Sequence, residues 1–172
     1  MILLDYGHGK DTPGKRCKGL HEWRFNRQVG RYLELELDSR NINYHVLVPG
    51  DDDIGLRTRV ELANYIDHDL LISIHGNAFS DPAVSGIETF YYSRAGRMAA
   101  DIFQKHLIQR TGWKDRGIKK GNFYIIKKSP KPAILTENGF YTNDNEREKM
   151  KDPHWQFEIA FAHADAIEEY LQ

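Results

Sequence analysis

Apolar residues follow two spacings along the chain, and the two spacings alternate from one segment to the next. Short continuous apolar runs, typical of buried strands, occupy 2–6, 43–48, 70–75, 86–92, 123–127 and 133–137. Apolar residues recur every three or four positions, as in amphipathic helices, over 22–40, 55–68, 95–111 and 155–171. Ser93 lies just before the third helical segment and is suited to cap it. The alternation predicts a single-domain α/β fold, with a mostly parallel, six-stranded twisted sheet flanked by helices.

Composition and charge narrow the class of protein. The chain has 172 residues, of which 40% are hydrophobic and 28% are charged, as in an ordinary globular domain. A formal net charge of −1 provides no field suited to nucleic acid or to an anionic membrane. No apolar run approaches the roughly 20 residues that cross a bilayer, so membrane insertion is not expected. The single cysteine, Cys17, excludes an internal disulfide and a cysteine-based metal cluster.

Three of the apolar runs end in the same unusual way. The runs "LLDY", "LLISI" and "AILT" are followed at once, or after one glycine, by His8, His75 and Glu137. Glycines accompany all three, at positions 7, 9, 76 and 139. Open α/β sheets bind ligands at the carboxyl ends of their strands. If these three strands are parallel neighbours, the two imidazoles and the carboxylate meet at one edge of the sheet.

Two histidines and one carboxylate are typical of a catalytic zinc site, which uses three protein ligands and leaves a fourth position for water. Glu22 opens the first helical segment soon after His8, so its carboxylate can turn back to the same edge. His21, beside it, is the only rival for the third ligand. Glu137 then remains for proton transfer, because amide hydrolysis needs a base for the water and an acid for the leaving amine.

Each of these residues, taken singly, also has an ordinary structural explanation. His75 could simply end a strand, and His8 could occupy a tight turn. Glu22 suits the first turn of a helix, where the helix dipole favours a carboxylate. Glu137 is harder to explain in this way, since a carboxylate after so apolar a strand needs a partner. The coincidence of all of them favours a functional site.

Seven segments in order along the chain resemble motifs of the zinc-dependent N-acetylmuramoyl-L-alanine amidases of the amidase family 3 type. These segments are "LDYGHG", "GLHEW", "LRTRVELAN", "LLISIHGNA", "SGIETFYY", "DRGIKKGNFYIIKKSPKPAIL" and "TENGFYTNDNE". Together they extend over nearly the whole chain. One such motif would be weak evidence, whereas seven in the same order form a specific match.

The resemblance implies hydrolysis of the amide between the lactyl group of N-acetylmuramic acid and L-alanine of the stem peptide, with peptidoglycan as the substrate. It assigns one Zn²⁺ per chain to His8, Glu22 and His75, and the catalytic role to Glu137. Residues 1–172 would form one catalytic domain, acting as a monomer, without a separate wall-binding domain. The alternatives are a zinc peptidase or deacetylase on the same scaffold, or a peptidoglycan-binding module with an inactive site.

Four further residues are candidates for contact with the substrate or for support of the site. Asn77 is expected to orient His75 or the substrate amide, and Glu88 to lie at the rim without binding the metal. Lys127 and Lys128 are candidates for binding stem-peptide carboxylates, although a solvated basic edge is the simpler explanation.

The chain departs from the family pattern at the proposed rim. Tyr6 replaces the usual proline of the first motif, and the loop 10–22 is not the common glycine-rich version, so both are expected to alter the rim. The first residues lack the basic and apolar regions of a secretory signal. We therefore expect synthesis in the cytoplasm and action at the cell wall after release, as for a phage or prophage lysin, or a domain of an exported enzyme.

Overall fold

The computed structural model describes residues 1–172 and contains one mixed sheet of six strands. The strands are β1 (Ile2–Tyr6), β4 (Tyr44–Val46), β5 (Leu70–Asn77), β6 (Ile87–Tyr91), β7 (Asp115–Lys120) and β8 (Ala133–Phe140), in the spatial order β4-β1-β5-β8-β6-β7. Neighbouring strands are parallel except for β6 and β8, which are antiparallel. As a result, β1, β5 and β8 lie side by side and end at the same edge of the sheet.

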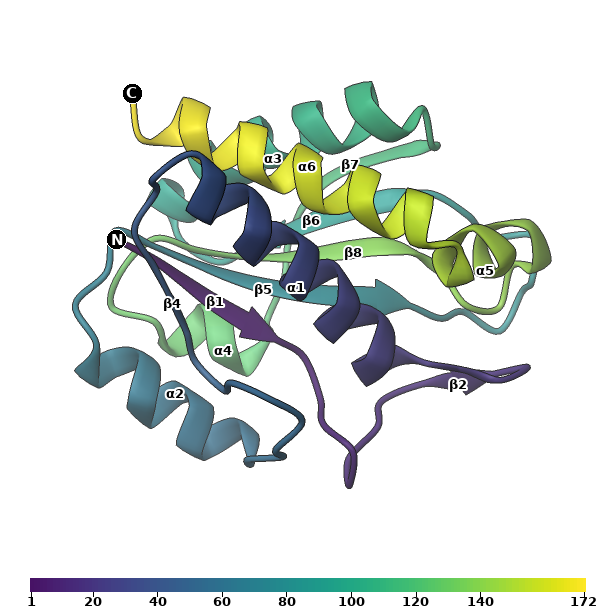
Figure 1. Cartoon of the computed structure of the whole chain (residues 1–172), viewed down its shortest axis with the longest axis horizontal. Coiled ribbons are helices and arrows are strands. Elements are labelled where there is room, and N and C mark those ends of the chain that lie inside the picture. The colour runs from purple at the N-terminus through teal and green to yellow at the C-terminus, as the bar shows by residue number, and fades with distance from the viewer.

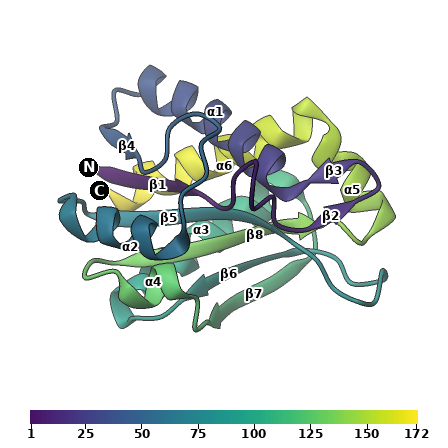
Figure 2. The ribbon, with the colours of Figure 1, turned by 90° about the horizontal axis from the view of Figure 1, so that it is seen from below.

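The chain has six helices (Figure 1). They are α1 (Glu22–Ser39), α2 (Leu56–Tyr65), α3 (Arg94–Thr111), α4 (Tyr124–Lys128), α5 (Asp144–Lys151) and α6 (Pro153–Tyr170). Helix α5 lies at the end of β8, and the other five cover the two faces of the sheet. Helices α1, α3 and α6 share one hydrophobic cluster with the sheet, and α2 and α4 share the other. A separate hairpin of β2 (Arg16–Cys17) and β3 (Leu20–His21) lies beside α5, where Lys18 Nζ is 3.0 Å from Asp144 Oδ1 (Figure 2).

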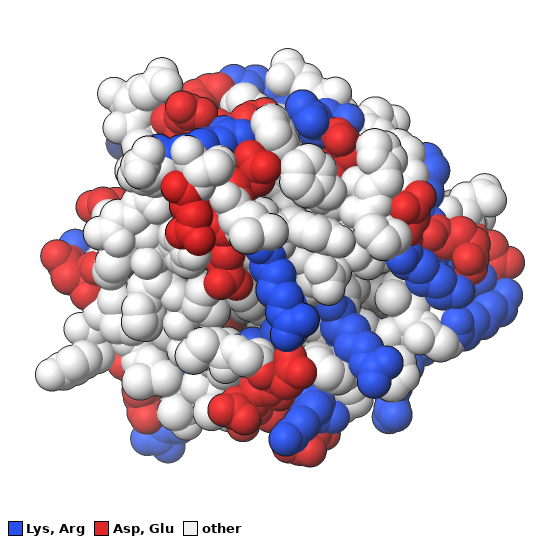
Figure 3. Space-filling view, viewed as in Figure 1, with Lys and Arg blue, Asp and Glu red and all other residues white.

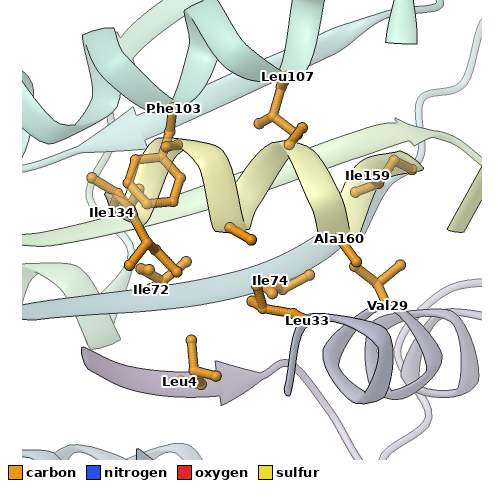
Figure 4. Packing of buried hydrophobic residues seen from close by; sticks show 14 of the residues in the cluster. Leu4, Val29, Leu33, Ile72, Ile74, Phe103, Leu107, Ile134, Ile159 and Ala160 are labelled. Carbon is orange, nitrogen blue, oxygen red and sulfur yellow. The ribbon is translucent and has the colours of Figure 1, made fainter. Parts of the chain in front are cut away.

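The central strands are buried on both faces, which explains why they are continuously apolar rather than alternating. Ile2 and Leu4 point into the larger cluster, of 26 buried residues, and Leu3 points into the smaller cluster, of 10. In the larger cluster, side chains of α1, α3 and α6 pack on those of β1, β5 and β8 (Figure 4), among them Leu4, Val29, Leu33, Ile72, Ile74, Phe103, Leu107, Ile134, Ile159 and Ala160.

Most of the expected elements are present, and the fold class is confirmed. The run at 2–6 is β1 with the same bounds. The four expected helices, and all the other expected strands but one, are present with ends that differ from the expected ones by a few residues. Ser93 caps α3 as expected, because its hydroxyl accepts a hydrogen bond of 3.0 Å from the Gly96 amide. The sheet is mostly parallel and has six strands.

One expected strand is wrong. The run 123–127 is not a strand, because residues 124–128 form helix α4, which buries Ile125 and Ile126 against the smaller cluster. The sixth strand is instead β7, whose sequence "DRGIKK" is polar because it lies at the edge of the sheet. A short apolar run does not distinguish a strand from one turn of buried helix. Helix α5 was not expected either, since Met150 is its only buried apolar residue.

Charges of both signs are interspersed over the face seen in Figure 3, in agreement with a net charge of −1. No helix has both the length and the apolar character that crossing a membrane requires.

His163 on α6 gives the fold a specific dependence on pH. Its Nδ1–H donates to the Ile159 carbonyl at 2.8 Å, so Nε2 accepts from the Thr136 hydroxyl at 3.0 Å. Burial lowers the pKa of His163 from 6.5 to about 4, although the Ile159 carbonyl opposes the shift. Between these two pH values, His163 is therefore protonated in the unfolded chain but neutral in the folded protein.

We predict that the free energy of unfolding falls by roughly 3 kcal/mol from this residue as pH decreases from about 6.5 to about 4. The variant His163→Gln, which cannot ionise, should lose this component of the pH dependence while being less stable than the wild type at pH 8. Denaturant unfolding of both proteins across this pH range measures the difference. Identical slopes for the two proteins would show that His163 is not the titrating group.

Candidate active site

The three strand ends singled out in the sequence converge at one edge of the sheet. β1 pairs with β5, β5 pairs with β8, and both pairs are parallel. His75 lies directly opposite Glu137 in the register of β5 and β8. His8 follows β1 after Gly7, whose amide donates to the Ile74 carbonyl at 3.1 Å and continues the pairing. The expected meeting of His8, His75 and Glu137 is therefore what the fold produces.

His8, Glu22 and His75 form a cluster that could hold a metal ion. One nitrogen or oxygen from each lies within 4.8 Å of the others. Glu22 Oε1 is 3.0 Å from His75 Nδ1 and 3.3 Å from His8 Nε2. Two imidazole nitrogens and a carboxylate facing one point are the donor set of a catalytic zinc site. His21, the rival ligand, belongs to β3, where it pairs with Arg16, and is not in this cluster.

Glu22 reaches the cluster because the hairpin β2–β3 folds the preceding loop back on itself. The Lys15 amide donates to Glu22 Oε2 at 2.8 Å, and the Glu22 amide donates to the Lys15 carbonyl at 3.0 Å. Gly14 has a φ of +71°, and a Cβ there would lie 2.4 Å from Glu22 Oε2 and 2.7 Å from His8 Cδ2. Only glycine suits both this conformation and this space.

Electrostatics within the cluster keep Glu22 ionised. Burial raises the pKa of its carboxyl group, but hydrogen bonds with His75 and His8 more than offset burial and lower the pKa to about 2. For His8, burial lowers the pKa, whereas the hydrogen bond and charge of Glu22 raise it above 6.5 overall. Glu22 thus presents an ionised carboxylate between the two imidazole rings.

Glu137 lies in the same cavity without a partner. Glu137 is 8% exposed, and its Oε2 atom is buried and makes no hydrogen bond. Burial raises the pKa of Glu137 well above 4.5, and the negative charges of Glu22 and Glu88 raise it further. A buried, unpaired carboxyl group is costly to a folded protein and is typical of functional sites.

Asn77 and Glu88 support one another at the rim. Asn77 Nδ2 donates to Glu88 Oε1 at 3.0 Å, and it makes no hydrogen bond with His75. Glu88 is buried and also accepts from Arg116 Nε at 2.7 Å and from Lys119 Nζ. Burial raises the pKa of Glu88, but Lys119 and Arg116 lower it below its usual value. Asn77 is thereby fixed by an ionised partner, with its side chain lining the cavity.

Two polar residues near the cluster were not expected from the sequence pattern. Asn138 Nδ2 donates to the His75 carbonyl at 3.0 Å and so fixes the end of β5. Arg59 is buried on α2, and its guanidinium donates to Asp5 Oδ1 at 2.8 Å, the Tyr6 carbonyl at 2.9 Å and the His8 carbonyl at 2.8 Å. The charged Asp5 within the apolar run "ILLDY" is the signal that could have indicated a buried cation.

Arg59 matters because His8 has an unusual backbone conformation. Its φ is +69°, a region that costs a non-glycine residue about 1–3 kcal/mol unless the surroundings hold it. The hydrogen bond from Arg59 to the His8 carbonyl provides that hold. His8 is therefore both the residue of a tight turn and a member of the cluster.

Tyr6 does not alter the rim, contrary to expectation. Its side chain is buried toward α1, and its hydroxyl donates to Glu34 Oε1 at 3.1 Å and to the Gly30 carbonyl at 3.3 Å. The reason is the alternation of side chains along β1, which places Tyr6 on the same face as Ile2 and Leu4. The loop after β1 does line the cavity, through Thr12 and Lys15.

A cavity of about 540 Å³ opens in front of the cluster, and its lining includes His8, Glu22, His75, Asn77 and Glu137. Its far wall comes from the start of α2 and from α4. Lys127 and Lys128, also on α4, do not line it, and Lys127 Nζ lies 5.6 Å from the centre of the Tyr92 ring.

A family model described as N-acetylmuramoyl-L-alanine amidase matches residues 2–169. The chain belongs to the N-acetylmuramoyl-L-alanine amidase family. The family and the class of enzyme expected from the seven sequence segments are thus confirmed.

Individual relatives agree with this family. The chain is 32% identical to the N-acetylmuramoyl-L-alanine amidase CwlM of Bacillus licheniformis, over 96% of this chain and 66% of that protein. It is 30% identical to the endolysin of Bacillus phage SPP1, over 99% of this chain and 66% of that protein. The catalytic domain of the amidase CwlV from Bacillus (Paenibacillus) polymyxa var. colistinus shares 31% identity and a TM-score of 0.94, over 99% and 97% of the two chains. The chain therefore spans about two thirds of the length of both curated relatives.

We predict that Arg59→Lys lowers the affinity of the cluster for Zn²⁺ by about 10- to 100-fold, because the His8 carbonyl loses its donor. Competition with a chromogenic zinc chelator measures the affinity, and thermal unfolding verifies that the variant is folded. Arg57→Lys is the matched control, since Arg57 lies on the same helix but is 87% exposed and pairs only with Glu61. Equal zinc affinity in the two variants would show that Arg59 has no influence on the cluster.

Proposed function

We propose that the chain is a zinc-dependent peptidoglycan hydrolase that cleaves the amide between the lactyl group of N-acetylmuramic acid and L-alanine. In this proposal His8, Glu22 and His75 hold the zinc ion, and Glu137 transfers the proton. The main support is one observation: three donor atoms lie within 4.8 Å of one another in a cavity that also contains an unpaired buried carboxyl group.

Zinc fits the donor set better than the other common metals. Magnesium and calcium prefer oxygen ligands, whereas two imidazoles with one carboxylate favour zinc and leave a coordination position open. When bound in such a site, zinc acts as a Lewis acid that activates water and stabilises negative charge on the substrate carbonyl. The ionised state of Glu22, with its pKa near 2, suits it to a cation.

Glu137 has the properties of a proton carrier for hydrolysis. Burial raises its pKa well above that of an ordinary carboxyl group, and a raised pKa is typical of a carboxyl group that donates a proton as well as accepting one. The carboxylate accepts a proton from the attacking water as the new C–O bond forms at the lactyl carbonyl. The carboxylic acid then donates that proton to the nitrogen of L-alanine as the C–N bond breaks. The products are a lactyl carboxylate and a stem peptide with a free amine.

Asn77 is suited to orient the substrate amide during these steps. Its Nδ2 donates to Glu88, and its Oδ1 accepts from the Ala78 amide at 2.8 Å, so the side chain cannot rotate freely. Glu88 itself is held by Arg116 and Lys119. Fixed polar groups of this kind lower the barrier by positioning the substrate. Glu88 therefore acts through Asn77 and not on the metal.

The site of action in this proposal is the bacterial cell wall, with peptidoglycan as the binding partner and a monomer as the active form. The relatives include a bacterial amidase and a phage endolysin, at 32% and 30% identity. These values are too similar to favour one biological origin. Release as a lysin and delivery as part of an exported enzyme both remain within the proposal.

We predict that Glu137→Gln lowers kcat by about 100- to 10,000-fold, because the amide cannot accept the proton from water. The measurement is the release of stem peptides with a free L-alanine amine from purified peptidoglycan. Zinc content should be unchanged, and Glu61→Gln, at an exposed position of α2, should retain wild-type activity. Undiminished release by Glu137→Gln would contradict the catalytic role of Glu137 and favour another proton carrier.

We further predict that elemental analysis of the purified protein finds one equivalent of zinc per chain. Dialysis against a chelator should abolish clearing of cell-wall suspensions, and added Zn²⁺ should restore it. The double variant His8→Ala/His75→Ala should retain neither zinc nor activity. Full activity in the chelated protein would rule out the metal-dependent mechanism.

A further inference from the structure

A second cavity adjoins the first. Its volume is about 350 Å³, and its lining includes Lys15, Arg16, Ala78 and Phe79. Lys15 and Ala78 line both cavities, so the two are adjacent, and the Lys15 amide at this boundary donates to Glu22 Oε2 of the cluster at 2.8 Å. The amide substrate has two arms, a sugar on the carbonyl side and a peptide on the nitrogen side. Each of the two cavities can therefore receive one arm of the substrate.

The outer wall of the first cavity is apolar and exposed. Leu56 from the start of α2 is 51% exposed, and Phe123 and Tyr124 at the start of α4 are 37% and 40% exposed. Phe123 is held in place by edge-to-face contact with Phe90, with ring centroids 4.8 Å apart. Rigid aromatic side chains of this kind provide contact area for an uncharged ligand with apolar faces.

No free charge lies in the outer part of the first cavity. Arg59 and Asp5, which also line it, are buried and paired with each other at 2.8 Å. The remaining charged residues of its lining are Glu22 and Glu137, which belong to the site itself, and Lys15, which lies at the boundary with the second cavity.

The second cavity has the opposite character. Lys15 and Arg16 are exposed, make no ion pair, and lie in a lining without any acidic residue. The nearby Lys18, by contrast, is neutralised by Asp144 at 3.0 Å. Phe79 adds an apolar surface that is 55% exposed. Two unpaired cations in a cavity beside the cluster favour a ligand with carboxylates.

We propose that the glycan arm of the substrate binds in the first cavity, against Leu56, Phe123 and Tyr124, and that the stem peptide binds in the second. Lys15 and Arg16 then bind a stem-peptide carboxylate, a role that the sequence had suggested for Lys127 and Lys128. This inference rests on the proposed function, because it assumes a muramoyl-peptide substrate. It specifies the orientation of that substrate at the cluster, with the sugar in one cavity and the peptide in the other.

The first test uses a muramoyl tripeptide with free carboxylates and an analogue in which these carboxylates are amidated. Lys15→Gln/Arg16→Gln should raise KM for the free carboxylate substrate by about 10-fold, with kcat changed by less than about 2-fold. KM for the amidated analogue should not change. Lys127→Gln/Lys128→Gln removes the same charge from α4 and should leave both KM values as in the wild type.

The second test concerns the glycan arm. Tyr124→Ala should raise KM for a disaccharide-bearing substrate by about 5- to 10-fold. For a lactoyl peptide that has no sugar, KM should be the same in the variant and the wild type. Zinc content and thermal unfolding verify that each variant retains its site and its fold.

The outcomes separate this inference from the proposed function. If the wild type cleaves none of these substrates, the proposed function is wrong. If the wild type cleaves them but Lys15→Gln/Arg16→Gln affects the free and amidated substrates alike, the assignment of the second cavity is overturned. An increase in KM only in Lys127→Gln/Lys128→Gln would place the peptide arm at α4 and reverse the orientation.

Discussion

Parallel pairing of β1 with β5 and of β5 with β8 is the constraint on which the candidate site depends. It brings three strand ends to one edge and sets His75 opposite Glu137. A slip of one residue would turn every side chain to the other face of the sheet. The register is protected because both faces are packed: Leu71 belongs to one hydrophobic cluster and Ile72 to the other. The geometry of the cluster is therefore maintained by the core behind it.

The site contains groups that make little or no favourable contribution to stability. Glu137 is buried without a partner, and His8 has a positive φ. The buried pair of Arg59 and Asp5 also contributes little net free energy, because desolvation offsets most of the attraction. Arg59 instead fixes the backbone before the cluster, since the same guanidinium donates to the carbonyls of Tyr6 and His8. Apolar burial in the two clusters supplies the stability that these groups do not.

The sequence revealed the parts of the site that lie at the ends of strands or directly after them. His8, His75 and Glu137 interrupt apolar runs, and a polar residue at the end of a buried strand is visible in a one-dimensional pattern. The position of Glu22 beside the two histidines was harder to predict from the sequence. It depends on the β2–β3 hairpin, whose two-residue strands are too short to show a periodic pattern of apolar residues. Arg59 was missed for a similar reason: its partners lie about fifty residues away, and only folding brings them together.

The one wrong strand has a direct consequence for substrate binding. As the fifth strand along the chain, "FYIIK" would have placed its aromatic residues within the sheet. As the start of α4, the same segment sends Ile125 and Ile126 into the core and leaves Phe123 and Tyr124 facing the cavity. His75 and Glu137 thus lie on regular strands, whereas the walls to which we assign the two arms of the substrate come from α4 and from the region of the β2–β3 hairpin. Short surface elements of this kind can change in sequence without disturbing the strand register of the sheet. The same cluster can therefore be combined with cavity walls that bind different substrates.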